Sequence, residues 1–224
     1  MLAFLLAALA SAAAQTVPGF RPPAVPLFLN SPYVNVWSAA THLFDVTPSL
    51  WNGDEVSMFS AVRVDGIAYR LMGNVNDSLP AVMMTPKQES LVVTSTQTAY
   101  SFLCGAVTVN MTFTSPLLPD DWDLLSRPAH YLTYAVAAVD GKAHKVQVYF
   151  DATGDFVAWQ TEVNMSWSRV NVTGAGEPVA ALKIGSTVQT PLQPGSDGDH
   201  LNWGNLYVMV ADAAHGAADG ATVV

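Results

Sequence analysis

The amino-acid sequence predicts an all-β protein that folds as an antiparallel β-sandwich. Short runs of alternating apolar and polar residues recur along the chain, and loops rich in Gly, Pro and Ser separate them. No window shows the long amphipathic period of a helix. The pairs Asp65-Gly66 and Asp140-Gly141 lie between such runs and are typical of tight hairpin turns, because Gly tolerates a positive φ. Many short strands with little helix favour a sandwich.

The chain begins with an uncharged apolar run, MLAFLLAALASAAA, over residues 1–14. The run ends on Ala12-Ala13-Ala14, which fits the small-residue pattern of a signal-peptide cleavage site. It is too short to span a bilayer, so a membrane anchor is the less favoured alternative. We expect residues 1–14 to be a signal peptide and the mature chain, from about Gln15, to be secreted.

Residues 15–56 are predicted to form a Pro-rich N-terminal arm. Five prolines occur between positions 18 and 32, and Tyr33 and Trp37 follow them. Such a segment is extended and loop-like, and we expect it to be braced against the domain that follows. A proline-rich recognition ligand is the alternative interpretation.

Residues 57–224 are predicted to form the sandwich itself. The expected strands occupy residues 57–64, 67–72, 91–98, 99–103, 106–114, 131–139, the run that ends at Asp151, 156–159, 164–172, 179–184 and 201–210. Residues 120–126 could form one helical turn with Asp120 or Asp121 near its start. The last residues, Ala221 to Val224, look like the start of a further strand, so we expect a fragment of a longer protein.

The stretch from Ser115 to Asp151 is the most informative part of the sandwich. Neither face of the run 131–139 is strongly polar, so we expect a strand that is covered on both sides. The turn at Asp140-Gly141-Lys142 predicts that this strand forms a hairpin with the next.

Composition argues against two classes of partner. The net charge is −9 with nine basic residues, and no basic cluster occurs, which excludes typical nucleic-acid and anionic-membrane binders. Charged residues make up only 12% of the chain, and glycans could supply the missing solubility in a secreted protein. N-x-S/T sequons occur at Asn76, Asn110, Asn164 and Asn171. The alternation of residues 106–114 places Asn110 on the solvated face.

No catalytic motif is evident in the sequence. Serine-hydrolase elbows, metal-binding helices, phosphate loops and C-x-x-C pairs do not occur. Cys104, the single cysteine, is expected to be a small buried residue rather than a nucleophile, since no basic residues surround it. The histidines are scattered, and spacing alone does not assemble a triad from them. They are His42, His130, His144, His200 and His215.

Acidic clusters offer a metal-binding alternative. Calcium could use the carboxylates of Asp120, Asp121 and Asp123, or those of Asp197 and Asp199. Neither cluster matches an EF-hand loop, so we favour solvated turn and helix-cap aspartates, with no metal and no cofactor. Spacing does not show that these carboxylates face one another as glycoside hydrolysis requires.

Six tryptophans form the most distinctive set of side chains, at positions 37, 51, 122, 159, 167 and 203. Exposed aromatic rings can stack on sugars, which favours a carbohydrate-binding module, whereas buried ones would fill the sandwich core or an interface to another domain. The core interpretation is favoured overall and for Trp203 in particular. Trp51 and Trp122 lie in loops beside acidic residues and are the better candidates for a surface or sugar contact.

Several segments together resemble the N-terminal region of the secreted glutaminase A family of fungi. They are Pro23-Ala24-Val25-Pro26-Leu27, Ser31-Pro32-Tyr33 with Trp37, Arg63-Val64-Asp65-Gly66 with Tyr69-Arg70 and Met72-Gly73, Ser115-Pro116 with Pro119-Asp120-Asp121, Ser126-Arg127-Pro128 with Tyr131-Leu132, Asp140-Gly141-Lys142 with His144 and Val146-Gln147-Val148-Tyr149, and Trp203-Gly204-Asn205-Leu206-Tyr207-Val208. One departure is Val56-Ser57-Met58-Phe59, where relatives often have a Gly-Trp pair.

The resemblance implies an extracellular hydrolase that converts L-glutamine to glutamate and ammonia. It also implies an N-terminal β-sandwich followed by a large α/α-barrel domain, which this chain lacks and which would be its partner. No catalytic residue is carried over, so the fragment is expected to be structural, with residues 120–126 as a contact surface. A stand-alone carbohydrate-binding module, with a glycan as its ligand, and a sandwich that itself hydrolyses a small molecule are the alternatives.

Overall fold

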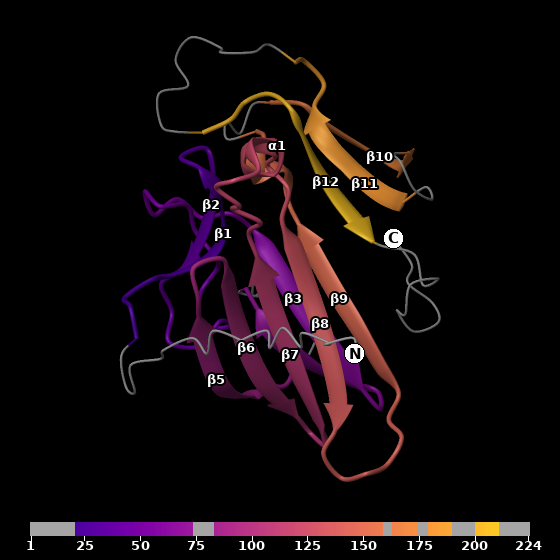
Figure 1. Ribbon diagram of the computed structural model, residues 1–224. Helices are drawn as coiled ribbons and strands as arrows, with labels where there is room; N and C mark the ends of the chain where they lie inside the picture. Colours follow the sequence, from indigo (N-terminus) through magenta and orange to yellow (C-terminus); the bar gives the residue numbers. More distant parts are fainter. Residues whose placement is uncertain (1–20, 74–82, 159–162, 174–178, 190–199, 211–224) are drawn as a thin grey trace, which may run out of the picture.

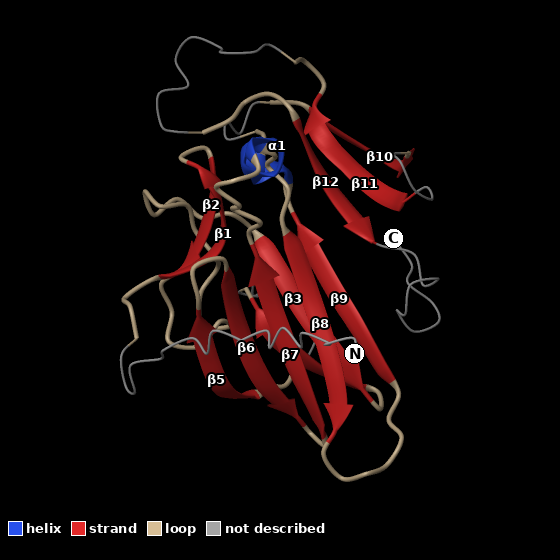
Figure 2. Ribbon diagram, in the orientation of Figure 1, coloured by secondary structure: helices blue, strands red, loops and turns tan. Residues whose placement is uncertain are grey.

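The computed structural model describes residues 21–73, 83–158, 163–173, 179–189 and 200–210, and their regular secondary structure is almost entirely antiparallel strand (Figures 1 and 2). The expected all-β class is confirmed. In chain order, the elements are β1 (Val25–Ser31), β2 (Val34–Ser38), β3 (Met58–Val64), β4 (Ile67–Met72), β5 (Lys87–Val93), β6 (Gln97–Cys104), β7 (Val107–Thr114), α1 (Trp122–Ser126), β8 (Tyr131–Ala138), β9 (Val146–Ala152), η1 (Gly154–Phe156), β10 (Met165–Val172), β11 (Val179–Ser186) and β12 (Asn205–Val210).

Two sheets form the sandwich. One has the strand order β4-β3-β9 and the other the order β5-β6-β7-β8. Alternation in the sequence decides which side chains enter the core: on β7, Val107 to Phe113 point inward at every second position, while Asn110 between them is exposed. Tyr100, Phe102 and Phe113 are the largest aromatic side chains of this core.

One hydrogen-bonded pair crosses the sandwich. The Tyr134 hydroxyl on β8 lies 2.7 Å from Ser60 Oγ on β3, and Ser60 Oγ donates to the Tyr149 carbonyl at 3.0 Å. Because a serine hydroxyl carries a single proton, Tyr134 must donate to Ser60. Burial raises the pKa of Tyr134, so the phenol stays protonated and keeps this bond at physiological pH.

The predicted N-terminal arm contains the β1–β2 hairpin. Val25, Leu27 and Val36 from this hairpin belong to the same buried cluster as the two sheets. Thr98 Oγ1 donates to the Pro26 carbonyl at 2.6 Å, which fixes β1 against β6. The described part of the arm therefore contributes to the sandwich core.

The prediction of a hairpin between the strands on either side of Asp140-Gly141 was wrong. β8 pairs with β7, whereas β9 pairs with β3 in the opposite sheet, so residues 139–145 cross between the sheets (Figure 1). Hydrogen bonds from the β3–β4 turn direct this crossing, since Asp65 Oδ1 accepts from the Lys145 amide at 2.9 Å. The expected cover on both faces of β8 was also wrong, because most of its residues are exposed.

A third sheet, β10-β11-β12, lies above β8 and β9 in Figure 1. Its three strands correspond to the predicted runs 164–172, 179–184 and 201–210. The predicted strand at 156–159 is replaced by the 3₁₀ turn η1, and its last residue, Trp159, lies outside the described residues. Among the described residues, no helix is long and apolar enough to cross a membrane.

The break between β5 and β6 falls earlier than predicted. The sequence suggested strands 91–98 and 99–103, but residues 94–96 form the turn. Thr94 Oγ1 accepts from the Gln97 amide at 3.0 Å, and the Thr94 amide donates to the Gln97 carbonyl at 2.8 Å. A threonine side chain thus closes a turn within an otherwise β-branched run.

Candidate functional site

The segment between β7 and β8 carries the predicted contact surface, and β1 holds it in place. Asp121 caps α1, as its Oδ1 accepts from the Leu124 amide at 3.0 Å. At the other end, the side-chain amide of Asn30 donates through Nδ2 to the Leu125 and Arg127 carbonyls, both at 3.1 Å. The one-turn helix predicted at 120–126 is therefore present, and its orientation is set by a side chain from the N-terminal hairpin.

Three apolar side chains on α1 or just before it are exposed, beside the exposed polar residues Asp123 and Ser126. Trp122 is 81% exposed, and Leu118 and Leu125 are also exposed. Trp122 and Leu125 are three positions apart and so lie on one side of the helical turn. We call Leu118, Trp122 and Leu125 the α1 patch. No residue of α1 is buried, so its sequence is not explained by packing within the described chain.

Trp51, the second predicted surface residue, is 56% exposed in the connection between β2 and β3. Its amide donates to Asn35 Oδ1 at 2.8 Å, and the Trp37 indole donates to the same oxygen at 3.1 Å. The same connection contacts the segment that precedes β12, since Asp54 Oδ2 lies 2.8 Å from His200 Nε2. Neither the acceptor role of Asn35 nor the contact of His200 with Asp54 was predictable from the sequence, because both depend on how separate segments fold together.

The core interpretation of the tryptophans was wrong for those that the structure describes. Trp167 and Trp203 are exposed, and Trp37 is half-buried. Tyrosine and phenylalanine fill the sandwich instead. None of the aromatic ring pairs within the described residues includes Trp51 or Trp122, and the two lie in different loops. Each would therefore offer a separate ring to a ligand.

His144 lies between two carboxylates from different turns. Its Nδ1 is 2.6 Å from Asp65 Oδ2, and its Nε2 is 2.9 Å from Asp140 Oδ1. Hydrogen bonds to Asp65 and Asp140 raise the pKa of His144, while hydrogen bonds to His144 lower the pKa of each aspartate. An imidazolium with both N–H groups engaged has no lone pair for a proton, so this cluster is a structural clasp.

His130 and Cys104 are equally unsuited to acid–base or nucleophilic work. Burial lowers the pKa of His130 to about 4, and its ring packs 5.0 Å from that of Phe28, so it is a neutral packing residue. Cys104 is fully buried in the core, and burial raises the pKa of its thiol to about 12. The prediction that Cys104 is a small buried residue is confirmed.

The acidic clusters give no support to a calcium site. Asp121 acts as a helix cap, and Asp120 and Asp123 are exposed beside it, whereas Asp197 and Asp199 lie outside the described residues. Within the part of the chain that the structure describes, no group of three or more His, Cys, Asp or Glu side chains is arranged so that it could hold a metal ion.

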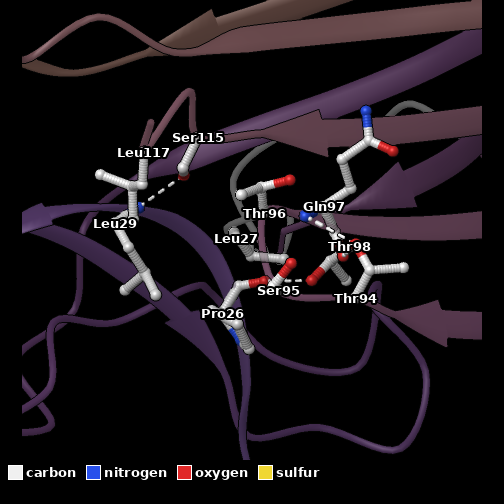
Figure 3. A pocket seen from close by; sticks show the side chains of 10 residues that line it. All are labelled: Pro26, Leu27, Leu29, Thr94, Ser95, Thr96, Gln97, Thr98, Ser115 and Leu117. Carbon is white, nitrogen blue, oxygen red and sulfur yellow. Dashed lines mark hydrogen bonds between the residues drawn. The ribbon is translucent and has the colours of Figure 1, made fainter. Parts of the chain in front are cut away.

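A small pocket lies between β1 and the turn that joins β5 to β6 (Figure 3). Its volume is about 10 Å³, which is room for about one water molecule. The side chains around it are engaged with each other: Ser115 Oγ accepts from the Leu29 amide at 2.9 Å (Figure 3). The pocket is therefore a packing gap between hairpins and not a substrate site.

Three of the four sequon asparagines can be located. Asn110 on β7, Asn164 before β10 and Asn171 on β10 are all exposed, as a glycan acceptor must be. Asn76 lies outside the described residues, as do residues 1–14, which were predicted to be a signal peptide, and residues 211–224, which include His215. Glycosylation of these sites stays a prediction.

Two known protein-family models match the chain. A family model described as "Domain of unknown function (DUF5127)" matches residues 96–223, which is more than half of the chain. The chain belongs to this family. A second model, "Domain of unknown function (DUF4964)", matches residues 7–84, which include the β1–β2 hairpin and the β3–β4 pair.

Two curated fungal proteins are similar to the chain. Glutaminase A of Aspergillus oryzae is 33% identical over 208 residues, which cover 89% of this chain and 29% of that protein. A probable glutaminase of Arthroderma benhamiae is 27% identical over 230 residues, which cover 93% of this chain and 26% of that protein. The resemblance to the N-terminal region of the glutaminase A family is confirmed, and the chain spans less than a third of the length of these relatives.

Proposed function

We propose that the chain is the N-terminal β-sandwich domain of a secreted, glutaminase A-like hydrolase and is not itself catalytic. The observation that carries this proposal is the similarity to Aspergillus oryzae glutaminase A over 89% of the chain but only 29% of that protein. The whole enzyme would hydrolyse the side-chain amide of L-glutamine to glutamate and ammonia, and its catalytic groups would lie in the polypeptide that follows.

The chemistry of the described residues supports a structural role. Groups that could act as a base or nucleophile are already engaged: His144 is held by two carboxylates, and Cys104 is buried with a raised pKa. The sandwich instead offers surfaces, of which the α1 patch is the one predicted from the sequence. We propose that the α1 patch contacts an α/α-barrel catalytic domain and helps to shape the entrance to its active site.

Secretion is part of the same proposal. The apolar run at residues 1–14 has the length and the small-residue ending of a signal peptide. The exposed positions of Asn110, Asn164 and Asn171 are compatible with addition of glycans during secretion.

The coding sequence downstream of Val224 tests the assignment. We expect it to continue in frame into a region rich in amphipathic helices, and the complete polypeptide to release ammonia from L-glutamine. Replacing Trp122 by Ala in that polypeptide should lower the thermal stability of the enzyme, because a ring now 81% exposed would lose its cover at the domain contact. A gene that ends at Val224 with no helical domain nearby would refute the proposal.

A carbohydrate-binding module remains the second candidate, favoured by the exposure of Trp51 and Trp122. Pull-down of the chain on insoluble polysaccharides tests it. Retention that is lost in Trp51→Ala or Trp122→Ala but kept in Trp167→Ala, a control at another exposed tryptophan, would support sugar stacking. Retention that none of these substitutions changes would exclude these two rings as the binding platform.

A further inference from the structure

The outer strands of the two sandwich sheets are β4, β9, β5 and β8. Such strands present unpaired backbone groups, and natural proteins protect them by cover, charge, proline or bulges. Two of these four edges are protected. β4 is covered at Met84, whose amide donates to the Ala68 carbonyl at 2.8 Å and whose carbonyl accepts from the Arg70 amide at 3.0 Å.

The β5 edge is protected in other ways. It carries Lys87 and Glu89, has a register shift between Gln88 and Ser90, and is tied to residues before β3. Gln88 Oε1 accepts from the Leu43 amide at 2.9 Å, and Gln88 Nε2 donates to the Thr41 carbonyl at 3.2 Å. These are the features expected of a strand that faces water.

The other two edges lack this protection. β8, with the sequence YLTYAVAA, has no charge, no proline and no bulge along its pairing with β7. β9, with the sequence VQVYFDA, has one acidic residue and is likewise regular along β3. β8 and β9 are end strands of the two sheets, are connected by residues 139–145, and are drawn on the same side of the sandwich in Figure 1.

The backbone groups that face this side follow from the pairing. The Val139 amide donates to the Ala106 carbonyl at 2.9 Å, which continues the β7–β8 register. Backbone groups of alternate residues point to opposite sides of an antiparallel strand. Leu132, Tyr134, Val136 and Ala138 therefore direct their N–H and C=O groups away from β7, toward the open side.

The same reasoning applies to β9. The Asp65 amide donates to the Lys145 carbonyl and the Thr153 amide to the Ser57 carbonyl, which fixes the odd-numbered residues of β9 toward β3. Val146, Val148, Phe150 and Ala152 consequently point their backbone groups outward. Among the described residues, β8 and β9 each have one strand neighbour.

Leu132 and Tyr134 on β8 and Phe150 on β9 are partly buried against the core, but two other apolar side chains of the interior face are exposed. Val136 is 43% exposed, whereas Val109, its partner on β7, is fully buried. Val148 is 43% exposed, whereas Val62, its partner on β3, is 1% exposed. The interior face of the sandwich is thus open at Val136 on β8 and at Val148 on β9. We call these two strands, with Val136 and Val148 between the sheets, the open flank.

We propose that the open flank binds one or more β-strands from the polypeptide that follows this region in full-length glutaminase A-like proteins. The inference rests on the proposed function, and it names the part of the molecule that the remaining polypeptide completes. The incoming strand would pair with the outward groups of β8, and its apolar side chains would cover Val136 and Val148. This contact is separate from the α1 patch.

The length of the relatives favours this occupant. More than two thirds of each relative lies outside the matched region. In a protein of that length, the polypeptide beyond the matched region is long enough to supply further strands. The open flank exposes an edge of each sheet and interior side chains between them. Strands added by the following polypeptide would pair with these edges and cover these side chains at the same time. A second copy of this chain is the competing occupant.

Hydrogen exchange resolved to single amides tests the proposal on two proteins, the chain of residues 15–224 and the complete polypeptide that contains it. The amides of Tyr134 and Val136 should exchange rapidly in the short chain and at least about 100-fold more slowly in the complete polypeptide. The amide of Ala135, which points to β7, is the internal control and should be protected in both. Equal exchange of Tyr134 and Val136 in the two proteins would overturn the proposal.

A pair of substitutions provides a second measurement. Val136→Lys places a charge on the open flank, and Val46→Lys places the same charge at a loop valine of matched exposure, 44% against 43%. Val136→Lys should lower the Tm of the complete polypeptide by about 5 °C or more, but that of the short chain by about 1 °C. Val46→Lys should have a small effect in both, and equal effects of the two substitutions in the complete polypeptide would contradict strand addition.

The outcomes separate this inference from the proposed function. If the complete polypeptide hydrolyses glutamine but its Tyr134 and Val136 amides stay unprotected, the inference fails and the function stands. If those amides are protected but glutamine is not hydrolysed, the inference stands and the function fails. A short chain that forms a dimer with β8 protected would identify a second copy as the occupant and overturn the proposal.

Discussion

The His144 clasp joins the β3–β4 turn to the crossing between β8 and β9, beside the hydrogen bonds between Asp65 and the Lys145 backbone. Its contribution to stability must depend on pH at both ends. The pKa of His144 is raised from 6.5, so the stability that the protonated imidazole contributes is fully present below pH 6.5. It is lost as pH rises through the raised pKa. The pKa of Asp65 is lowered from 3.8, so its part is present above that value and is lost as pH falls through the lowered pKa.

We therefore predict that His144→Gln narrows the pH range of maximal stability. The difference in Tm between the wild-type chain and His144→Gln should be largest between about pH 4 and 6.5 and should shrink on either side. Added salt should reduce this difference in Tm, because Asp65 and Asp140 are in contact with solvent. Thermal unfolding followed by circular dichroism across pH 3–9 measures this.

His42→Gln is the matched control for this prediction. His42 also contacts an aspartate, Asp45, with Nδ1 2.9 Å from Oδ2, but the pair spans only three residues and joins no separate turns. Its substitution should change Tm little at any pH. A Tm difference for His144→Gln that is constant from pH 3 to 9 would show that the clasp carries no ionic contribution.

Tyr134 offers a second test at the level of single residues. Its hydroxyl donates to Ser60 Oγ in the other sheet, so Tyr134→Phe removes a buried hydrogen bond and leaves Ser60 without its donor. We expect a loss of about 1 kcal/mol in the free energy of unfolding, measured by urea denaturation. Tyr131→Phe, at an exposed position on the same strand, should leave the unfolding free energy unchanged, and equal losses would refute the role of the bond.

At the scale of elements, Gly73 is a position where β4 comes too close to β3 for a side chain. Its φ is +80°, and a Cβ atom there would collide with the Met58 carbonyl oxygen. Gly53 has a similar φ of +95° but open space around it. Gly53→Ala should therefore lower the free energy of unfolding by about 1 kcal/mol, through backbone strain alone. Gly73→Ala should lower the free energy of unfolding clearly more, because the steric collision adds to the strain. Urea denaturation of the two variants measures the difference, and equal costs would contradict the close approach.

Elements with local sequence patterns were predictable, and elements that depend on distant contacts were not. The β3–β4 hairpin follows from Asp65-Gly66 between two alternating runs, and the strand at 106–114 follows from strict alternation. The same Asp-Gly pattern at 140–141 failed, because the Asp65 and His144 contacts carry the chain to the opposite sheet. A local turn pattern says where a chain turns but not which strand it then joins.

The candidate surfaces show the same division. Trp51 and Trp122 were predictable as exposed residues, since they lie in loops beside acidic side chains. The exposure of Trp203 was not, because it sits at the start of an apolar run that reads as core. The open flank was missed because β8 has the two-sided apolar pattern of a covered strand, while the structure leaves it exposed. Strand addition would reconcile the pattern with the structure.

At the scale of the whole molecule, the sandwich has apolar surfaces that its own described residues do not cover. The α1 patch and the open flank lie on different elements, and each matches a role in a longer polypeptide. Similarity to the N-terminal region of fungal glutaminases supplies the context in which both surfaces would be buried. Under the proposed function, the sandwich would support a catalytic domain and would not be an enzyme in itself.

Ammonia release from L-glutamine by two purified proteins, residues 15–224 alone and the complete polypeptide, tests the central claim most directly. We predict turnover by the complete polypeptide and none above background by residues 15–224, at equal molar concentration and with folding of the short chain verified by circular dichroism. Turnover by residues 15–224 would contradict the claim, since the sandwich would then contain the catalytic groups.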